Sequence, residues 1–335
     1  MKTLSIAGRE IGFSSPPLII AEIGNNHDGD KSQAIDLIAA AAESGAHAVK
    51  FQTYSPEKLV TPDHELYDFF NQFRLPREWH GELKDEAEKR GMLFLSTPFD
   101  VDSAEFLNEL KIPAFKISSS DLTNLPLIRR CAQFEKPLLI STGMGTLKET
   151  GAAIEAAHIH GCYNVSILHC VSIYPTPVDQ SQINAITELS RLFNVIVGFS
   201  DHSLSPTLPC VAVTLGARII EKHLTLSRKL DGPDHAVALE PDEFALMVRS
   251  CEEAMASRSI PGKTLTPDLN KVRSASLRGL YAARDIMAGA VITERDIIPL
   301  RPAAELTISD LARVIGRKVA RSVAKGEAIS ADILD

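Results

Sequence analysis

Two histidines stand where they could share one metal ion. His202 lies in the segment GFSDHS and His223 in the segment IEKH, and each closes a short apolar run that is typical of a buried strand. Two neutral imidazoles on neighbouring strand ends could hold a divalent cation and leave other coordination positions to water and substrate oxygens. The same rings could instead hydrogen-bond to loops, and their positions alone leave both interpretations open.

One lysine and four serines form a second set with a common chemistry. Each follows a short apolar run, and together they favour a phosphate site, because the lysine supplies charge and the hydroxyls donate hydrogen bonds. A single serine at such a place would more often cap the next helix. The chain contains neither GxGxxG nor GxxxxGK(S/T), so neither usual nucleotide-binding loop is expected. The five residues are Lys116, Ser119, Ser141, Ser172 and Ser200.

Several carboxylates and one further lysine could act on a substrate. Glu22 lies within an otherwise apolar run, which argues against a plain surface role. Asp201 could orient the imidazole of the adjacent His202. Lys50 could form a Schiff base, as in an aldolase, or bind an anion. The carboxylates that could orient water or shuttle protons are Glu22, Asp121, Glu221 and Asp234.

The elements that must position these residues form a repeat. Short β-branched runs without polar alternation are typical of strands buried on both faces of a parallel sheet, and here they alternate with stretches of helical periodicity. Eight such units in about 240 residues predict an α/β protein with a (β/α)8 TIM barrel, whose chemistry lies at the carboxyl ends of its strands. An open doubly wound sheet is the alternative, but it usually has fewer strands. The runs lie at 18–23, 48–52, 92–96, 114–118, 137–142, 165–170, 195–200 and 218–223.

The composition of the chain changes after the last helical stretch. Residues 257–273 contain two prolines and a glycine and are typical of a linker. We therefore predict a TIM-barrel catalytic domain over 1–256, a linker over 257–273 and a small β-rich domain over 274–335. About 60 residues would be marginally stable alone, so we expect the second domain to pack on the barrel or on a second subunit.

Composition and charge exclude several classes of function. The 335 residues carry a net charge of −8, which argues against a nucleic-acid partner or an anionic membrane. No apolar run approaches the length of a membrane span, and the first residues show no secretory signal, so we expect a cytoplasmic protein. The 5 cysteines contain no CxxC pair, which indicates reduced thiols.

Nine ordered segments give the chain a family resemblance. It resembles the sialic acid synthases, which use phosphoenolpyruvate to make N-acetylneuraminate and related nine-carbon sugars. LYAARDIMAGAVITERDI and GRKVARSVAKGEAI are similar to the antifreeze-like SAF domain, a small β-clip module. The nine segments are AEIGNNHDGD, AVKFQTY, STPFD, KISSSDLTNLPLI, STGM, LHCVSIYPTP, GFSDHS, IEKHLTL and DGPDHAVALEPDEF.

The resemblance assigns roles to individual residues. It implies a homodimer in which the SAF domain of one subunit covers the barrel of the other, and a Mn²⁺ or Mg²⁺ ion held by His202 and His223. The residues expected to contact phosphoenolpyruvate are Lys50, Lys116, Ser119, Ser141, Ser172 and Ser200. The residues expected near the sugar are Gln52, Thr97, Tyr174, Asp234 and Arg301. The expected catalytic residues are Glu22, Asp121 and Lys50.

The implied reaction condenses phosphoenolpyruvate with the open-chain aldehyde of N-acetylmannosamine and water. It gives N-acetylneuraminate and phosphate by C–O cleavage. A legionaminate synthase that uses 2,4-diacetamido-2,4,6-trideoxymannose is the alternative within the family. Outside it, the alternatives are a pyruvate-dependent Schiff-base aldolase and a catalytically silent sugar-binding or assembly protein.

Two departures from the family pattern and one segment that is present bear on the reaction and its sugar. The segment KISSSD stands where many relatives read KxGSGE, so the carboxylate at position 121 is one methylene shorter. RPAAELT replaces a glycine-rich turn after Arg301 and restricts the backbone there. The GPDH segment, which pseudaminate synthases tend to lack, favours N-acetylneuraminate or legionaminate chemistry.

Overall fold

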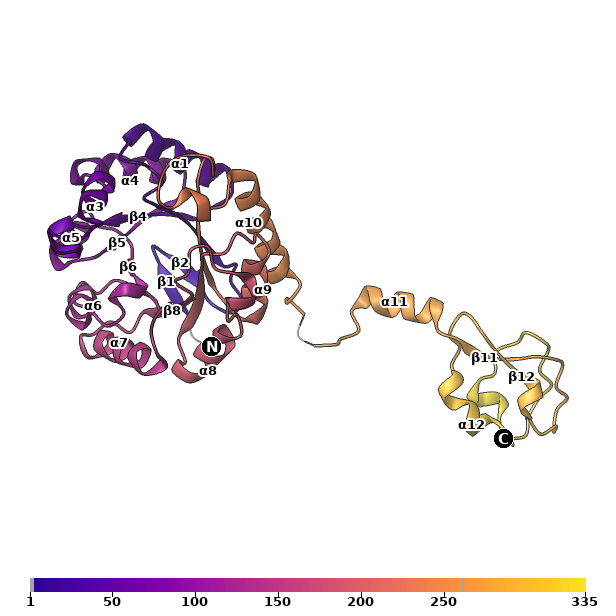
Figure 1. Cartoon of the computed structure of the whole chain (residues 1–335). Coiled ribbons are helices and arrows are strands. Elements are labelled where there is room, and N and C mark those ends of the chain that lie inside the picture. Colours follow the sequence, from indigo (N-terminus) through magenta and orange to yellow (C-terminus); the bar gives the residue numbers. More distant parts are fainter. Residues whose placement is uncertain (1–2, 261) are drawn as a thin grey trace. The chain divides into compact units, whose positions relative to one another are not determined.

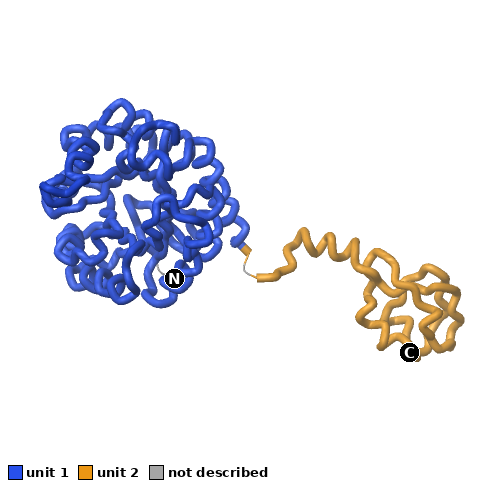
Figure 2. The backbone as a smooth tube through the Cα atoms, viewed as in Figure 1, with its two compact units in different colours: residues 1–259 blue, residues 260–335 orange. Residues whose placement is uncertain are grey.

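The chain folds as two compact units, residues 1–259 and 260–335 (Figures 1 and 2). The computed structural model describes residues 3–260 and 262–335. The first unit holds the predicted barrel and the second holds the predicted β-rich domain. Part of the predicted linker belongs to a helix, α11 (Pro267–Ser276).

Eight parallel strands make up the sheet of the first unit. They are β3 (Leu18–Gly24), β4 (Ala48–Thr53), β5 (Leu93–Pro98), β6 (Phe115–Ile117), β7 (Leu138–Ser141), β8 (Val165–Cys170), β9 (Ile196–Asp201) and β10 (Ile219–His223). Their order is β5-β4-β3-β10-β9-β8-β7-β6, and β5 and β6 lie against each other, so the sheet curls into a nearly closed ring. The predicted (β/α)8 TIM barrel is confirmed.

Helices surround the ring of strands (Figure 1). Their ends carry the expected caps: Asp30 accepts hydrogen bonds at the start of α1, and Thr146 forms a capping box with Glu149 at the start of α7. The helices that follow the strands are α1 (Lys31–Glu43), α4 (His80–Lys89), α5 (Val101–Glu109), α6 (Leu125–Ala132), α7 (Leu147–Ile159), α8 (Ala185–Phe193), α9 (Leu208–Leu215) and α10 (Pro241–Ala256). Two short helices, α2 (Pro56–Leu59) and α3 (Tyr67–Phe73), lie in the connection between β4 and α4.

Successive side chains of each strand point to opposite faces of the sheet, so the core of the first unit has two parts. Ile19 and Ala21 of β3 belong to the large apolar cluster between strands and helices. Leu18 and Ile20 belong to a smaller cluster inside the barrel, which also contains Leu4 from the antiparallel hairpin β1 (Leu4–Ile6) and β2 (Arg9–Ile11). The hairpin therefore fills the amino-terminal end of the barrel, and the carboxyl end is left for polar side chains.

The second unit has an apolar core of its own. The strands β11 (Gly279–Ala282) and β12 (Ile297–Leu300) pair antiparallel, and the bridge between Ile286 and Val323 ties further segments together. One short helix, α12 (Leu311–Val314), follows β12. The buried side chains of this core include Leu280, Ile292, Val314, Val319, Ile329 and Ile333.

Within residues 3–260 and 262–335, no helix has both the length and the apolar character that a membrane crossing requires.

Candidate active site

A cavity of about 410 Å³ opens at the carboxyl ends of the barrel strands. Side chains at alternate positions of a strand point to the same side, so residues two positions beyond the inner apolar layer, such as Glu22 beyond Ile20, reach this space. Of the candidate residues in the first unit, Asp121 and Asp201 do not line it, and Arg301 belongs to the second unit. The predicted residues that line it are Glu22, Lys50, Gln52, Thr97, Lys116, Ser119, Ser141, Ser172, Tyr174, Ser200, His202, Glu221, His223 and Asp234.

Two lysines connect the residues that form the floor of this cavity. Lys50 Nζ lies 2.7 Å from Glu22 Oε2 and donates to Thr97 Oγ1 at 2.9 Å. Lys116 Nζ donates to Ser141 Oγ at 2.6 Å and lies 3.7 Å from Glu221 Oε1. The floor therefore holds positive charge that two carboxylates partly balance.

Burial and charge act against each other at these groups. Burial would raise the pKa of Glu221, but attraction by Lys116 and Lys50 outweighs it and lowers the pKa to about 2. Burial would lower the pKa of Lys50, yet the neighbouring carboxylates Glu22 and Glu221 raise it above its usual value. Burial lowers the pKa of Lys116. Lys50 is thus held as an ammonium group, which binds anions well and is a poor nucleophile.

Glu221 has a larger part in this floor than the sequence indicated. It was one of four carboxylates that could orient water, whereas the structure places it within 4 Å of both lysines. Ser200 Oγ also donates to Glu221 Oε1 at 2.9 Å. Glu221 therefore belongs to the anion-binding floor as its internal counter-charge.

His202 and His223 come together at the rim of the cavity. Their ring centroids are 5.5 Å apart, and the ring of Tyr174 stacks on His202 at 4.0 Å. His202 Nδ1 lies 2.9 Å from the carbonyl oxygen of Val171 and must donate to it, so His202 Nε2 keeps its lone pair. Burial, with a smaller contribution from His223, lowers the pKa of His202 to about 3. The imidazole is therefore neutral, as a metal ligand must be.

These rings fit a divalent cation. His223 Nδ1 is buried and has no hydrogen-bond partner, which is an unusual state for a ring nitrogen that only serves the fold. Asp234 Oδ2 is 4.0 Å away from it. In the described part of the chain, no group of three or more His, Cys, Asp or Glu side chains is arranged to hold a metal. The two imidazoles would thus be the protein's whole contribution, and the remaining positions would be open to substrate and water.

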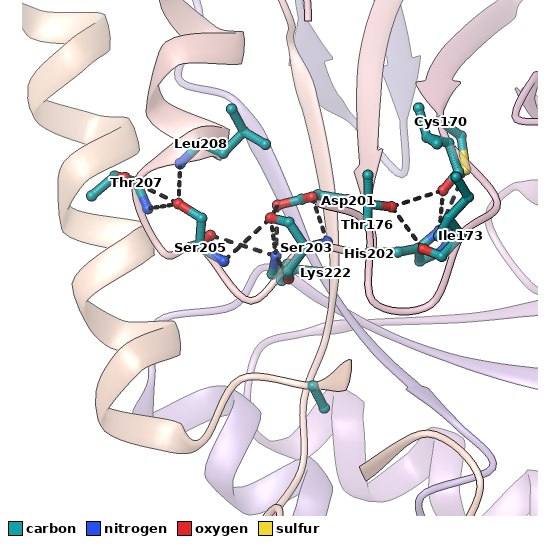
Figure 3. A network of polar contacts seen from close by, with 12 residues as sticks. Cys170, Ile173, Thr176, Asp201, His202, Ser203, Ser205, Thr207, Leu208 and Lys222 are labelled. Carbon is teal, nitrogen blue, oxygen red and sulfur yellow. Dashed lines mark hydrogen bonds and ion pairs between the residues drawn. The ribbon is translucent and has the colours of Figure 1, made fainter. Parts of the chain in front are cut away.

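A buried ion pair joins the two residues that precede the histidines in the sequence, and Figure 3 shows it together with His202. Lys222 Nζ is 2.6 Å from Asp201 Oδ2, and both side chains are almost fully buried. The backbone N–H of Ser203 donates to Asp201 Oδ1 at 2.8 Å. Asp201 and Lys222 directly precede His202 and His223, so the pair joins the two strand ends that carry the rings. The expectation that Asp201 orients an imidazole directly is wrong, because its oxygens are taken by Lys222 and Ser203.

The loops after β3 and β10 are locked to each other beside the cavity. Gly24 has a φ of +55°, and a Cβ there would lie 2.7 Å from Asp234 Oδ2, so only glycine permits this approach. Asn25 N–H donates to the same oxygen at 3.2 Å. Further out, His235 Nε2 lies 2.8 Å from Asp28 Oδ2. Asp234 is therefore held at a fixed place on the rim.

Asp121 is not brought into the cavity. It lies in a short 3₁₀ helix (Ser119–Asp121), where its carboxylate accepts from Ser118 Oγ at 2.7 Å and from Asn124 Nδ2 at 2.9 Å. These local hydrogen bonds direct the carboxylate away from the cavity, because the N-cap residues Ser118 and Asn124 compete for its oxygens. Ser118 and Ser120 line the cavity.

Arg301 lies in the second unit, just after β12, and is exposed. A cis peptide bond joins it to Pro302. Its predicted role at the sugar of the other subunit stays a prediction.

The sequence reasoning missed a group of residues on the wall of the cavity. Phe69 and Phe70 come from α3, and they could not be placed because that helix stands in a long irregular connection without a strand to set its position. Asn25 offered a signal, since it lies in the AEIGNNHDGD segment next to Glu22. The lining residues that were not predicted are Asn25, Phe69, Phe70, Phe99, Ser118, Ser120, Met144, Cys170 and Pro233.

Comparisons with known proteins show which family the chain is similar to. The model of the NeuB family matches residues 37–260, and the model of the SAF domain matches residues 278–334. An uncharacterized protein of Methanocaldococcus jannaschii is 38% identical over 95% of this chain and 95% of its own. The N,N'-diacetyllegionaminic acid synthase of Legionella pneumophila is 34% identical over 94% of both chains.

A solved structure is also similar to this chain. The N-acetylneuraminic acid (sialic acid) synthetase of Leptospira borgpetersenii, crystallised with citrate, superposes with a TM-score of 0.78 at 31% identity. The alignment covers 81% of this chain and 95% of that one. The resemblance read from the nine sequence segments is thereby confirmed: the chain belongs to the NeuB family of sialic acid synthases and carries a C-terminal SAF domain.

Proposed function

We propose that this protein condenses phosphoenolpyruvate with the open-chain aldehyde of N-acetylmannosamine and water, giving N-acetylneuraminate and phosphate. One observation carries the proposal above all: a buried floor with two lysines lies beside the paired imidazoles of His202 and His223 in a single cavity. Such a cavity suits one substrate with two anionic groups and a second one with a carbonyl oxygen.

The lysines supply the contacts for phosphoenolpyruvate. Lys50 and Lys116 would bind its carboxylate and phosphate with charge-assisted hydrogen bonds, and hydroxyls such as Ser141 would add neutral ones. Because Glu22 and Glu221 already hold the lysines in place, little side-chain entropy remains to be lost when the substrate binds. Most of the protein's contribution would be positioning and preorganised charge.

The covalent steps balance without any redox partner. C3 of phosphoenolpyruvate forms a bond to the aldehyde carbon, whose oxygen takes up a proton. Positive charge develops at C2, where water adds and gives a proton to a carboxylate. Glu22 is the candidate for this carboxylate, since it points into the cavity and is held by Lys50 and Gln52. The C2–O bond then breaks, the departing phosphate takes the proton of the C2 hydroxyl, and a ketone remains at C2.

A divalent cation would polarise the aldehyde as a Lewis acid. His202 and His223 would hold it, and Asp234 and Tyr174 would border the sugar beside it. Mg²⁺ prefers oxygen ligands, so an imidazole pair favours Mn²⁺ of the two metals implied by the family.

The experiment that tests the function follows phosphate release. The protein is incubated with Mn²⁺, phosphoenolpyruvate labelled with ¹⁸O at the C2–O bridge, and a panel of 2-acetamido hexoses. We expect sugar-dependent release of ¹⁸O-phosphate, since the C–O bond breaks. Unlabelled phosphate, or no release with any sugar, would contradict the proposal.

A legionaminate synthase is the second candidate. The relative from Legionella pneumophila supports it, and the same panel separates the two when it includes 2,4-diacetamido-2,4,6-trideoxymannose. A higher kcat/KM with that sugar than with N-acetylmannosamine would identify the protein as a legionaminate synthase.

A Schiff-base aldolase is disfavoured by the state of Lys50. Its ion pair with Glu22 keeps it protonated, whereas a Schiff base needs a free amine. Borohydride with pyruvate should leave Lys50 unlabelled, and a covalent adduct there would support the aldolase.

A further inference from the structure

A second cavity lies at the amino-terminal end of the barrel. It measures about 520 Å³ and is lined by Phe13, Arg218, Glu252, Met255 and Arg258, among others. A neighbouring cavity of about 230 Å³ shares Phe13 and Arg218 with it. Arg218 comes just before β10, whose far end carries His223, so this space lies at the end of the barrel opposite the candidate active site.

Arg218, which lines both cavities, has a buried hydrogen-bonding edge without a partner. The residue is 3% exposed, and its Nη1 donates to the carbonyl oxygens of Ala217 at 2.8 Å and Val213 at 3.3 Å. Its Nε and Nη2 are buried and have no hydrogen-bond partner. These two nitrogens form one side of the guanidinium, the fork whose spacing matches the two oxygens of a carboxylate or phosphate.

The charge of Arg218 has no counter-charge in the described part of the chain. Glu252 lines the same cavity, but no ion pair joins it to Arg218 among the described residues. Arg258 adds a second positive charge: its guanidinium and that of Arg218 both lie over the Phe13 ring, at 5.3 and 5.1 Å. Burial, with a smaller effect of Arg258, lowers the pKa of Arg218 to about 10, so it stays charged at neutral pH.

A buried charge without a partner is costly. Removal of an ion from water costs several kcal/mol even in a relaxed protein, and the free fork adds two unmade hydrogen bonds. The fold does not need a guanidinium here, because the two carbonyl contacts of Nη1 use only one of its nitrogens. An oxyanion on this edge would supply both the counter-charge and the two hydrogen bonds.

We propose that this cavity binds a small oxyanion, with a carboxylate or phosphate group on the Nε–Nη2 edge of Arg218. Arg258 supplies further positive charge, and Phe13, about half exposed, covers the guanidinium until the ligand enters. The ligand binds at the opposite end of the barrel from Lys50 and Lys116, so it does not compete with phosphoenolpyruvate.

The free edge itself gives the most direct readout. The full chain is labelled with ¹⁵N, and the arginine Nε–H signals are recorded during titration with inorganic phosphate and, separately, with acetate. The signal of Arg218 is identified by its absence in Arg218→Lys, which keeps the positive charge, and in Arg218→Met. Because the readout belongs to one residue, anions that bind near Lys116 do not disturb it.

We expect this signal to shift saturably with at least one of the two anions. Arg249 is the internal control. It is exposed on α10, the helix that carries Glu252, and its signal should not shift. A shift with phosphate alone assigns a phosphate ligand, and a shift with acetate alone assigns a carboxylate. In Arg218→Lys the Nε–H signal of Arg258, which lines the same cavity, reports binding, and the anion should bind at least about tenfold more weakly because an ammonium group cannot form the fork.

Two results would overturn the proposal. The first is an Arg218 signal that does not move with either anion into the tens of millimolar, which would mean that water satisfies the fork. The second is a loss of stability in Glu252→Gln without any anion, which would identify Glu252 as the counter-charge in solution. If the site takes an anion, Glu252→Gln should instead tighten its binding, since a like charge is removed.

Discussion

At the scale of single residues, the candidate active site depends on two buried lysines, of which Lys50 is held as an ammonium group by its neighbouring carboxylates. Lys50 and Lys116 lie between carboxylates and hydroxyls and are about 3% exposed. Glu221, almost as deeply buried, balances part of this charge from within. A ligand with two anionic groups would add charge-assisted hydrogen bonds to lysines that their neighbours already hold in place.

Lys116→Met should weaken phosphoenolpyruvate binding. A charge-assisted hydrogen bond contributes about 1.5–3 kcal/mol, so the KM for phosphoenolpyruvate should rise by about 10- to 100-fold while the KM for the sugar changes less. Steady-state kinetics with either substrate varied checks this. Lys148→Met, on the exposed start of α7, is the matched control. An unchanged KM for phosphoenolpyruvate would remove Lys116 from its assigned place.

His80 should make stability depend on pH. Its Nδ1 donates to the Pro76 carbonyl, its Nε2 accepts from Thr53 Oγ1 at 2.8 Å, and burial lowers its pKa to about 4. The unfolded chain takes up this proton near pH 6.5, so the contribution is complete above that pH and is lost as the pH falls toward 4, by about 3 kcal/mol at most.

Denaturant unfolding at several pH values between 7.5 and 4 measures this effect. His80→Gln can keep both hydrogen bonds without a titrating group, so its stability should fall less over that range than that of the unchanged protein. Equal pH dependence of the two chains would show that His80 does not keep its neutral state in the fold.

At the scale of elements, strand alternation explains why most of the site could be predicted. Leu139 belongs to the inner layer of the barrel, and Ser141 two positions on lines the cavity. The same rule holds for Lys50 after Ala48. The direction of a side chain at a strand end can be predicted from the register of its own strand alone, and the apolar run already indicates that register.

The residues that could not be predicted depend on other geometry. Asp121 stands beyond a strand, and the hydrogen bonds of a 3₁₀ helix decide its direction. Phe69 and Phe70 enter from α3, whose place is set by tertiary packing of aromatic rings such as Tyr54 against Phe70. Local patterns contain no information about either.

The ion pair between Asp201 and Lys222 should hold the two histidine-bearing strand ends in place (Figure 3). Asp201→Asn keeps an oxygen for the Ser203 N–H but leaves a buried ammonium without its counter-charge. We expect it to lower the free energy of unfolding by about 3–5 kcal/mol and to weaken Mn²⁺ binding about 10- to 100-fold. Denaturant unfolding and electron paramagnetic resonance of free Mn²⁺ measure the two effects.

The double variant Asp201→Asn with Lys222→Met is the control for charge. Without the ammonium, much of the stability should return, whereas Mn²⁺ binding should stay weak because the strand ends are no longer joined. Full Mn²⁺ affinity in both variants would show that the pair serves stability alone.

At the scale of the whole molecule, the chain has two units with separate cores. The family resemblance implies that the SAF domain of one subunit covers the barrel of its partner and brings Arg301 to the sugar. The residue pattern alone could not place Arg301, because its predicted contacts lie with another subunit and not within its own unit.

Chains with different defects should complement each other if Arg301 acts across a dimer. Arg301→Ala and His202→Ala are each expected to have little activity alone. When the two are co-expressed, mixed dimers contain one intact site, so about a quarter of the unmodified activity should return. Activity assays on the purified mixture check this, and no recovery would contradict a site shared between subunits.

The most direct test of the account is Mn²⁺ binding to the two imidazoles. Titration followed by electron paramagnetic resonance is carried out on the unmodified chain, His202→Ala, His223→Ala and the exposed-loop control His64→Ala. The account predicts a single Mn²⁺ per chain in the unmodified protein and in His64→Ala, with affinity at least about 100-fold lower in the other two. Equal binding by His202→Ala and the unmodified protein would contradict it.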